Sequence, residues 1–266
     1  MTMQPPLLEV RGLAKRFATR VGEEAPRWVI RDLDFSVAEG EFLTIVGPSG
    51  SGKTTLLNMI AQVDTATEGS LLFRAQPAPV TNPKALNPGL SCQIGYVTQE
   101  DNLLPWRTAL DNVLFPLMVQ GRLNAESRAR AAMLMEAVGL KGFESHYPHE
   151  LSGGMCKRVS LIRTLVYDPP VILMDEPFGA LDAQTRVQLQ TDLLRLWNLG
   201  RKTIVFVTHD IAEAIALADR TLVLCRAPAK IIGNHIIDIP RPRDVDGLLA
   251  NPRFVALYQA IRSQVQ

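Results

Sequence analysis

A glycine-rich loop between an apolar strand and a helical pattern is the feature that most restricts the fold of this chain. The stretch GPSGSGKTT, residues 47–55, contains Gly47, Gly52, Lys53 and Thr54 at the spacing of a P-loop. The run EFLTIV before it is typical of a buried parallel strand, and KTTLLNMIAQV after it has helical spacing. The loop therefore stands in the strand–loop–helix context that this phosphate-binding motif requires.

Each residue type in the loop has a physical role. The glycines let main-chain N–H groups point toward phosphate oxygens, and the positive end of the next helix lies at the same place. Lys53 can reach the β- and γ-phosphates of a nucleotide, and Thr54 can offer its hydroxyl to Mg²⁺. A kinase, a GTPase and a transport motor all remain open at this step. We predict that the nucleotide is bound by Gly47, Pro48, Ser49, Gly50, Ser51, Gly52, Lys53, Thr54 and Thr55.

The rest of the chain alternates strand-like and helical patterns. Three apolar runs, VILMD, TIVFVTH and RTLVLC, are separated by helical segments at 182–200 and 210–219. This alternation predicts a parallel sheet with helices on its faces. No strand pattern is found between Leu104 and His149, so we expect a helical insertion there. The tail begins with a Pro-rich connector and ends in a short helical pattern.

Polar residues follow several of the apolar runs. Asp175 ends VILMD, one strand over from the P-loop, and can hold Mg²⁺ through water. Glu176 comes next and is predicted to act as the base for, or to orient, an attacking water. His209 ends another run, where it either contacts the γ-phosphate, holds the catalytic geometry or is a satisfied, partly buried histidine. Gln99 ends IGYVTQ and is either a Mg²⁺ ligand, a water-positioning amide or a surface residue.

Composition excludes several classes. The 266 residues are 47% apolar and 21% charged with a net charge of +1, which fits a globular chain and gives no basic field for nucleic acid. The N-terminus lacks a signal-peptide pattern, and no stretch is apolar enough to span a bilayer. Cys92, Cys156 and Cys225 lack metal-ligand spacing and are expected to be reduced thiols.

Collected in order, these motifs resemble the nucleotide-binding subunit of ATP-binding cassette (ABC) transporters. GPSGSGKTT resembles Walker A, Gln99 the Q-loop glutamine, LSGGM the signature, and VILMDE Walker B with its catalytic glutamate. GALD, with Asp182, resembles the D-loop, and His209 resembles the switch histidine. The resemblance implies an ATPase that uses ATP and Mg²⁺, with Thr54, Gln99 and Asp175 around the metal.

The family resemblance also implies a fold. We expect an α/β P-loop NTPase core with a parallel sheet, an N-terminal antiparallel β subdomain and a helical subdomain insertion. The ABC ATPase domain would span residues 7–240, with the helical part at about 102–160. Residues 241–266 would form a C-terminal tail with a short helix.

In this family the ATP site is shared between two copies paired head to tail. The resemblance assigns Ser152, Gly153 and Gly154 to the γ-phosphate of the partner's ATP. The residues themselves agree, since Ser152 is a good N-cap and the glycines clear N–H groups at a helix N-terminus. Lys157, in the unusual pair Cys156-Lys157, is expected to keep a positive charge beside this phosphate site. An aromatic residue stacks on adenine in the family, for which Phe17 is the better match and Trp28 the rival.

Finer features resemble the importers of nitrate, sulfonate, taurine and related solutes. LLPWRTALDNVLFPL, HDIAEAIALADRTLVL and the tail IDIPRPRD carry this likeness. The implied partners are a membrane permease, contacted at the cytoplasmic face of the cell membrane, and indirectly an extracytoplasmic solute-binding protein. The plausible permease groove residues are Leu103, Leu104, Trp106 and Phe115. An ABC exporter ATPase, or a non-transport ABC ATPase of DNA repair or translation, is the alternative.

Overall fold

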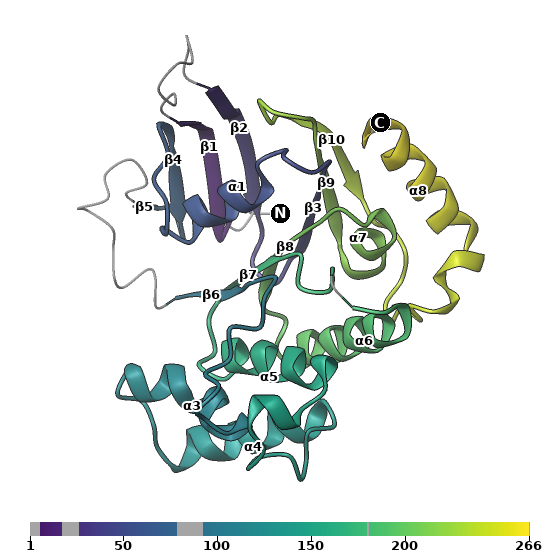
Figure 1. The fold of residues 1–266 in the computed structure, drawn as a ribbon. Coiled ribbons are helices and arrows are strands. Elements are labelled where there is room, and N and C mark those ends of the chain that lie inside the picture. The colour runs from purple at the N-terminus through teal and green to yellow at the C-terminus, as the bar shows by residue number, and fades with distance from the viewer. Residues whose placement is uncertain (1–5, 18–26, 79–92, 180, 266) are drawn as a thin grey trace, which may run out of the picture.

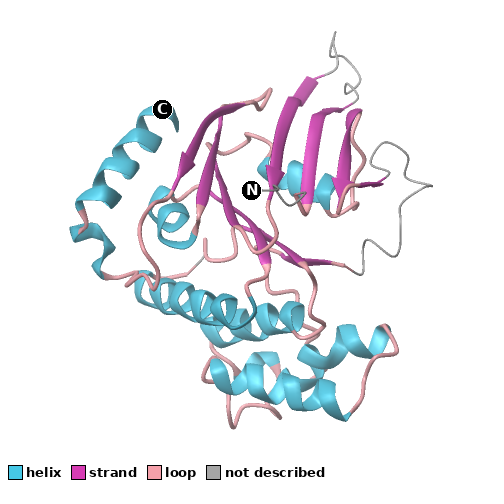
Figure 2. Cartoon of the chain, turned by 180° about the vertical axis from the view of Figure 1, so that it is seen from behind, coloured by secondary structure: helices cyan, strands magenta, loops and turns pink. Residues whose placement is uncertain are grey.

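The computed structural model describes residues 6–17, 27–78, 93–179 and 181–265. Two sheets meet in its upper part, and a group of helices lies below the larger one (Figure 1). The view from behind shows the same division, with the C-terminal helix along one flank (Figure 2). Within these ranges no helix combines the length and the apolar composition needed to cross a membrane.

The larger sheet has six strands in the order β10-β9-β3-β8-β7-β6. All neighbouring pairs are parallel except β10 with β9. The central strands β3, β7 and β8 are buried along their whole length, as their continuous apolar sequences predict. The strands are β3 (Phe42–Val46), β6 (Ile94–Val97), β7 (Val171–Asp175), β8 (Thr203–Thr208), β9 (Arg220–Leu224) and β10 (Ile231–Ile236).

The smaller sheet is antiparallel, with the order β2-β1-β4-β5. Its inner face and α1 (Lys53–Ile60) share one apolar core with the larger sheet. A turn at residues 38–40 separates β2 from β3. The strands are β1 (Leu8–Phe17), β2 (Arg27–Val37), β4 (Glu68–Phe73) and β5 (Gln76–Ala78).

The helical insertion is present between β6 and β7, with no strand among its residues, all of which the structure describes. It contains α3 (Ala109–Val119), α4 (Ala125–Ala137) and α5 (Gly153–Leu165), and α3 packs on both α4 and α5. The expected C-terminal boundary of the helical subdomain, near residue 160, falls within α5. A second apolar core joins these helices to the face of the large sheet and to α6 (Ala183–Gly200).

The C-terminal part holds more structure than its sequence pattern indicates. β10 was not expected, because its half-exposed sequence IIGNHI lacks a continuous apolar pattern. α8 (Pro252–Val265) is 14 residues long, not short, and it packs on β10 and on α7 (Ile211–Leu217). A third apolar core lies between α7, α8 and the sheet. The tail is therefore built onto the body of the molecule.

Candidate functional site

The P-loop joins the end of β3 to the start of α1. Gly52 is the N-cap of α1 at φ 85°, in the left-handed region that favours glycine. A Cβ at Gly47 would lie 2.9 Å from the Leu224 carbonyl oxygen, so only glycine fits that close approach. The N-cap has no side-chain acceptor. The first N–H groups of α1 are thus left for an anion.

Two buried polar side chains lie inside the loop. Lys53 is 5% exposed, and its Nζ donates to the carbonyl oxygens of Gly47 at 2.9 Å and Pro48 at 3.2 Å. Burial lowers the pKa of Lys53, and the carboxylates of Glu176 and Asp175 oppose that change. Ser51 Oγ is buried without a hydrogen-bond partner among the described residues. A phosphate oxygen is the kind of acceptor that would satisfy this hydroxyl.

Asp175 ends β7 and is 8% exposed. Burial raises its pKa, and a hydrogen bond with the side chain of Thr54 opposes that rise. The strand β8 lies between β7 and β3, so Asp175 is two strands from the P-loop strand rather than on its neighbour. The carboxylate nevertheless meets the first turn of α1. A hydroxyl and a carboxylate side by side are the oxygen donors that suit Mg²⁺.

Glu176 and His209 form the direct link between two strand ends. His209 Nδ1 and Glu176 Oε2 are 2.7 Å apart, and Glu176 Oε1 lies 3.7 Å from Lys53 Nζ. Glu176 has φ 43°, a rare conformation for a residue with a side chain. Its N–H donates to the carbonyl of Val207 on β8, which fixes this turn against the next strand. The structure thus brings Lys53, Glu176 and His209 together.

Gln99 lies in the loop after β6 and is exposed. A Cβ at Gly179 would lie 3.9 Å from Gln99 Nε2 and 3.9 Å from Glu176 Oε2. The Gln99 amide and the Glu176 carboxylate therefore both lie next to Gly179. Its predicted role as a metal ligand stays a prediction.

Phe17 and the P-loop line one cleft of about 280 Å³. The ring is 45% exposed at the end of β1, and Lys15 Nζ lies 5.0 Å from its centroid. The same cleft includes Glu176. Trp28 instead packs against the guanidinium groups of Arg16 and Arg31. Residues 18–26, which stand between Phe17 and Trp28 in the sequence, lie outside the described residues.

The signature residues Ser152, Gly153 and Gly154 line a different cleft, of about 450 Å³. Ser152 caps α5, with its Oγ accepting from the N–H of Met155 at 3.3 Å, as the sequence predicts. A Cβ at Gly153 would meet nothing within 4 Å, whereas one at Gly154 would lie 2.8 Å from Thr185 Cγ2. Asp182 caps α6 at the same cleft, and main-chain N–H bonding lowers its pKa. This chain therefore keeps its signature away from its own P-loop.

The expectation that Lys157 stands beside the phosphate site is wrong. Its side chain is buried, and Nζ contacts the carbonyl oxygens of Gln99 at 2.7 Å and Thr98 at 3.3 Å and a carboxylate oxygen of Asp101 at 3.0 Å. The physical reason is helical phase, which turns position 157 toward the loop after β6. Lys157 therefore fastens that loop to α5.

The two arginines that follow Lys157 on α5 also bind neighbouring protein groups. Arg158 Nε pairs with Asp192 on α6 at 3.0 Å. Arg163 donates to the carbonyl oxygens of Asp101 and Asn102, both at 2.7 Å. Cys156 is a free thiol, as expected, and burial raises its pKa.

Sequence reasoning missed Glu213, a buried acid beside the site. Glu213 Oε1 accepts from Gln190 Nε2 at 3.0 Å, and a further hydrogen bond joins it to the side chain of Thr208. Burial raises the pKa of Glu213 to about 7. The sequence does hold a signal for this residue. Glu213 stands four residues after His209, on the helix face whose residues Ala214 and Leu217 are buried in the core.

Comparisons with known proteins agree with this geometry. The model of the ABC transporter family matches residues 30–179. An uncharacterised ABC transporter ATP-binding protein of Methanocaldococcus jannaschii is 47% identical over 80% of this chain and 76% of its own length. A taurine import ATP-binding protein of Yersinia pestis is 38% identical over 89% of this chain and 91% of its own length.

A solved structure is similar as well. The dimeric structure of an ATP-binding cassette in a post-hydrolysis state, bound to ADP and Pi, aligns with a TM-score of 0.73 at 32% identity. The alignment covers 88% of this chain and 100% of the other. The predicted α/β P-loop NTPase fold and the predicted family are both confirmed. The chain belongs to the ABC transporter family and is one of its ATP-hydrolysing subunits.

Proposed function

We propose that this chain drives import of a small solute through a membrane permease by hydrolysing ATP between two head-to-tail copies. The observation that carries the proposal is the separation of two half-sites in one chain. The cleft of the P-loop contains Lys53 and Glu176, while Ser152 and Gly153 line another cleft. A second copy, turned to face the first, would bring each signature to the other copy's P-loop.

The P-loop cleft supports a division of labour in hydrolysis. Its main-chain N–H groups and Lys53 would hold the phosphates, and Phe17 would support the adenine ring. Glu176 would orient water in line with the γ-phosphate, because His209 fixes one carboxylate oxygen and leaves the other near Lys53. The partner's signature helix would add its positive end to the developing charge.

Thr54, Asp175 and Gln99 are the residues that would hold Mg²⁺. The described residues contain no cluster of three or more His, Cys, Asp or Glu side chains that could bind a metal. The Thr54 hydroxyl, the Asp175 carboxylate and the Gln99 amide are oxygen donors of the kind that would hold Mg²⁺ together with the phosphates. Bound Mg²⁺ would neutralise charge on the phosphate oxygens.

The docking surface for the permease would lie beside the loop of Gln99. Trp106 is 71% exposed, and the half-buried ring of Phe115 lies 5.1 Å from the Arg107 guanidinium carbon. Leu103 packs on the helical core, so it contributes less surface. The attachment would hold the chain as a peripheral subunit at the cytoplasmic face of the membrane.

The proposed solute class rests on the taurine import relative and on the sequence segments that resemble nitrate, sulfonate and taurine importers. A taurine-like sulfonate or a small oxyanion such as nitrate would be recognised by the permease and an extracytoplasmic binding protein. We retain residues 7–240 as the ATPase domain, the helical subdomain near 102–160, and residues 241–266 as the tail.

Glu176→Gln tests the hydrolytic role. The amide keeps the size and one acceptor but cannot take a proton, so turnover should fall by about 100-fold or more while ATP affinity stays within about twofold. Steady-state phosphate release and binding of a fluorescent ATP analogue measure these quantities. Glu136→Gln, at an exposed glutamate on α4, is the matched control. Hydrolysis near the wild-type rate in Glu176→Gln would remove Glu176 from the mechanism.

A further inference from the structure

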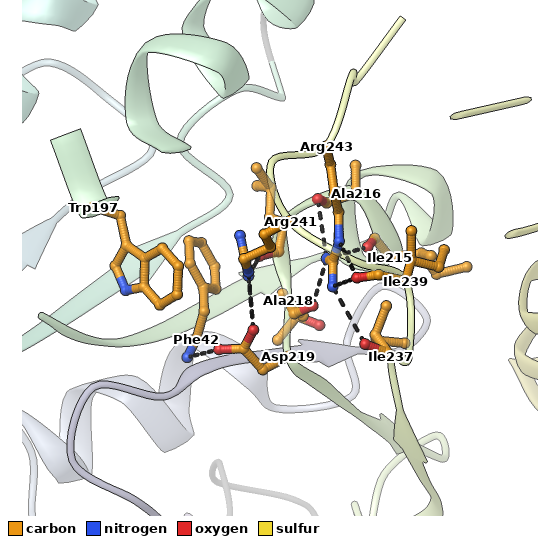
Figure 3. A network of polar contacts seen from close by, with 12 residues as sticks. Phe42, Trp197, Ile215, Ala216, Ala218, Asp219, Ile237, Ile239, Arg241 and Arg243 are labelled. Atoms are coloured by element: carbon orange, nitrogen blue, oxygen red, sulfur yellow. Dashed lines mark hydrogen bonds and ion pairs between the residues drawn. The ribbon is translucent and has the colours of Figure 1, made fainter. Parts of the chain in front are cut away.

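Arg243, in the tail, is only 9% exposed. Among the described residues no carboxylate forms an ion pair with it, whereas Arg241 pairs with Asp219. The Arg243 side chain lies among main-chain oxygens at the end of α7 and in the segment that follows β10 (Figure 3). All three guanidinium nitrogens donate. The acceptors, at 2.6–3.3 Å, are the carbonyl oxygens of Ile215, Ala216, Ala218, Ile237 and Ile239.

Three of these acceptors are at the C-terminal end of α7. The last carbonyls of a helix lack intrahelical partners and carry the negative end of its dipole. One planar guanidinium with five N–H groups can satisfy several of them, which a lysine ammonium with three cannot match. Burial lowers the pKa of Arg243 to about 10, so it remains charged at neutral pH. Arg243 is therefore a side-chain cap for α7.

Arg241 fastens the same segment to the opposite side. Its Nε donates to Asp219 at 3.0 Å, and its guanidinium carbon lies 4.2 Å from the Trp197 ring centroid. The other carboxylate oxygen of Asp219 accepts from the N–H of Phe42 at 3.0 Å. Figure 3 shows Arg241 between Trp197 and Asp219, with Arg243 beyond it. The tail is thus tied to α6, to the start of β3 and to α7.

α7 depends on caps because it is only seven residues long. Helices of this length are not stable alone, so their ends and their packing decide whether they persist. At the other end, Asp210 Oδ1 accepts from the N–H groups of Ala212 and Glu213. Asp210 directly follows His209, and the Asp210 N–H donates to Thr208 Oγ1 at 3.0 Å. These hydrogen bonds connect the start of α7 to the turn that carries His209.

We propose that Arg241 and Arg243 form a strap that holds α7 and thereby positions His209 against Glu176. Both arginines are positioning residues, since neither lies in the P-loop cleft. The catalytic part of this inference rests on the proposed function. The tail is then part of the hydrolytic machinery.

The test compares Arg243→Met, Arg243→Lys and the control Arg253→Met in the full chain. Arg253 lies on the same tail but pairs with Asp238 at the surface. In Arg243→Met, amide hydrogen exchange in residues 210–218 should accelerate by about tenfold or more, while residues 42–60 exchange as in the wild type. The kcat for ATP hydrolysis should fall by about fivefold or more with KM for ATP unchanged. Arg243→Lys should lie between, and Arg253→Met should match the wild type.

Three outcomes would overturn the strap. Unchanged exchange in 210–218 would show that Arg243 does not hold α7, and faster exchange everywhere would show only a general loss of stability. Faster exchange confined to α7 with kcat unchanged would show that α7 does not position His209. A wild-type chain without ATP hydrolysis would refute the proposed function instead, and hydrogen exchange would still decide whether the strap holds α7.

Discussion

Glu176 has an unusual backbone for a residue at the end of a buried strand. A positive φ of 43° at a side-chain-bearing residue costs on the order of 1 kcal/mol or more, and such conformations persist where surrounding contacts impose them. Here the N–H bond to Val207 and the 2.7 Å contact with His209 impose it. The carboxylate is thereby held at the mouth of the P-loop. At this scale the site is a set of fixed polar contacts made before substrate arrives.

Glu213→Gln should make stability less dependent on pH. The pKa of Glu213 is raised from 4.5 to about 7 in the folded chain, so the folded state keeps a proton that the unfolded state has lost between these values. The wild-type free energy of unfolding should therefore fall as pH rises through this window. Glutamine is neutral throughout, and the variant should be more stable than the wild type at pH 8 by about 3 kcal/mol.

Urea unfolding at pH 5 and pH 8 measures this difference. The advantage of Glu213→Gln should shrink toward pH 5, where the buried glutamate is protonated. An advantage of the same size at both values would contradict a protonated Glu213. Thr208 and Gln190 bond this group, and Asp210 and Arg186 act on it by charge, so none of them is changed in the test.

Local motifs and long-range contacts differ in how far sequence can predict them. Lys53, Asp175, Glu176 and His209 follow apolar runs whose strand ends must meet at one sheet edge, so their assembly could be predicted. Arg243 could not be assigned, because its acceptors are main-chain oxygens, which carry no sequence signal.

At the scale of elements, α5 connects the signature cleft to the loop of Gln99. Its first turn presents Ser152 to one cleft, and farther along Lys157 and Arg163 hold the loop of Gln99. A motion of this helix would therefore move the signature and that loop together. The assignment of Lys157 to phosphate failed because sequence spacing does not tell which neighbour a helix face meets. The same limit hid β10, which pairs antiparallel at the sheet edge through half-exposed residues.

Lys157→Met should loosen the loop after β6 without unfolding α5. Methionine keeps the buried stem but leaves the Thr98 and Gln99 carbonyls without this donor, at a cost of ~1–3 kcal/mol in unfolding free energy. Hydrogen exchange at residues 98–102 should rise, while Arg163 still holds the far end of the loop. Lys141→Met, at an exposed lysine paired with Glu136, is the control and should change neither quantity. Unaltered exchange at 98–102 would show that Lys157 does not fasten the loop.

At the scale of the whole molecule, one chain carries two separate clefts, each of which would be an incomplete site in the proposed mechanism. The P-loop cleft holds Lys53 and Glu176, the residue proposed to orient water, and the signature cleft holds a helix N-terminus with open space at Gly153. The strap ties the tail to the same body, so the proposed permease surface, the nucleotide cleft and the tail are linked through α5, α6 and α7. ATP bound between two copies would be the contact that closes them.

The shared ATP site can be tested by measuring the mass of the Glu176→Gln chain in the presence of ATP, alone and combined with Gly153→Asp. Asp at the first turn of α5 meets nothing in its own chain and favours the helix dipole, so thermal stability should not fall. It would, however, place a negative charge against the partner's γ-phosphate. Gly153→Ala is the matched control. With ATP, light scattering should give twice the 29.3 kDa of one chain for Glu176→Gln and for its Gly153→Ala form, but a monomer for its Gly153→Asp form. An ATP-dependent dimer that persists with Gly153→Asp, or a Glu176→Gln chain that stays monomeric with ATP, would contradict the shared site.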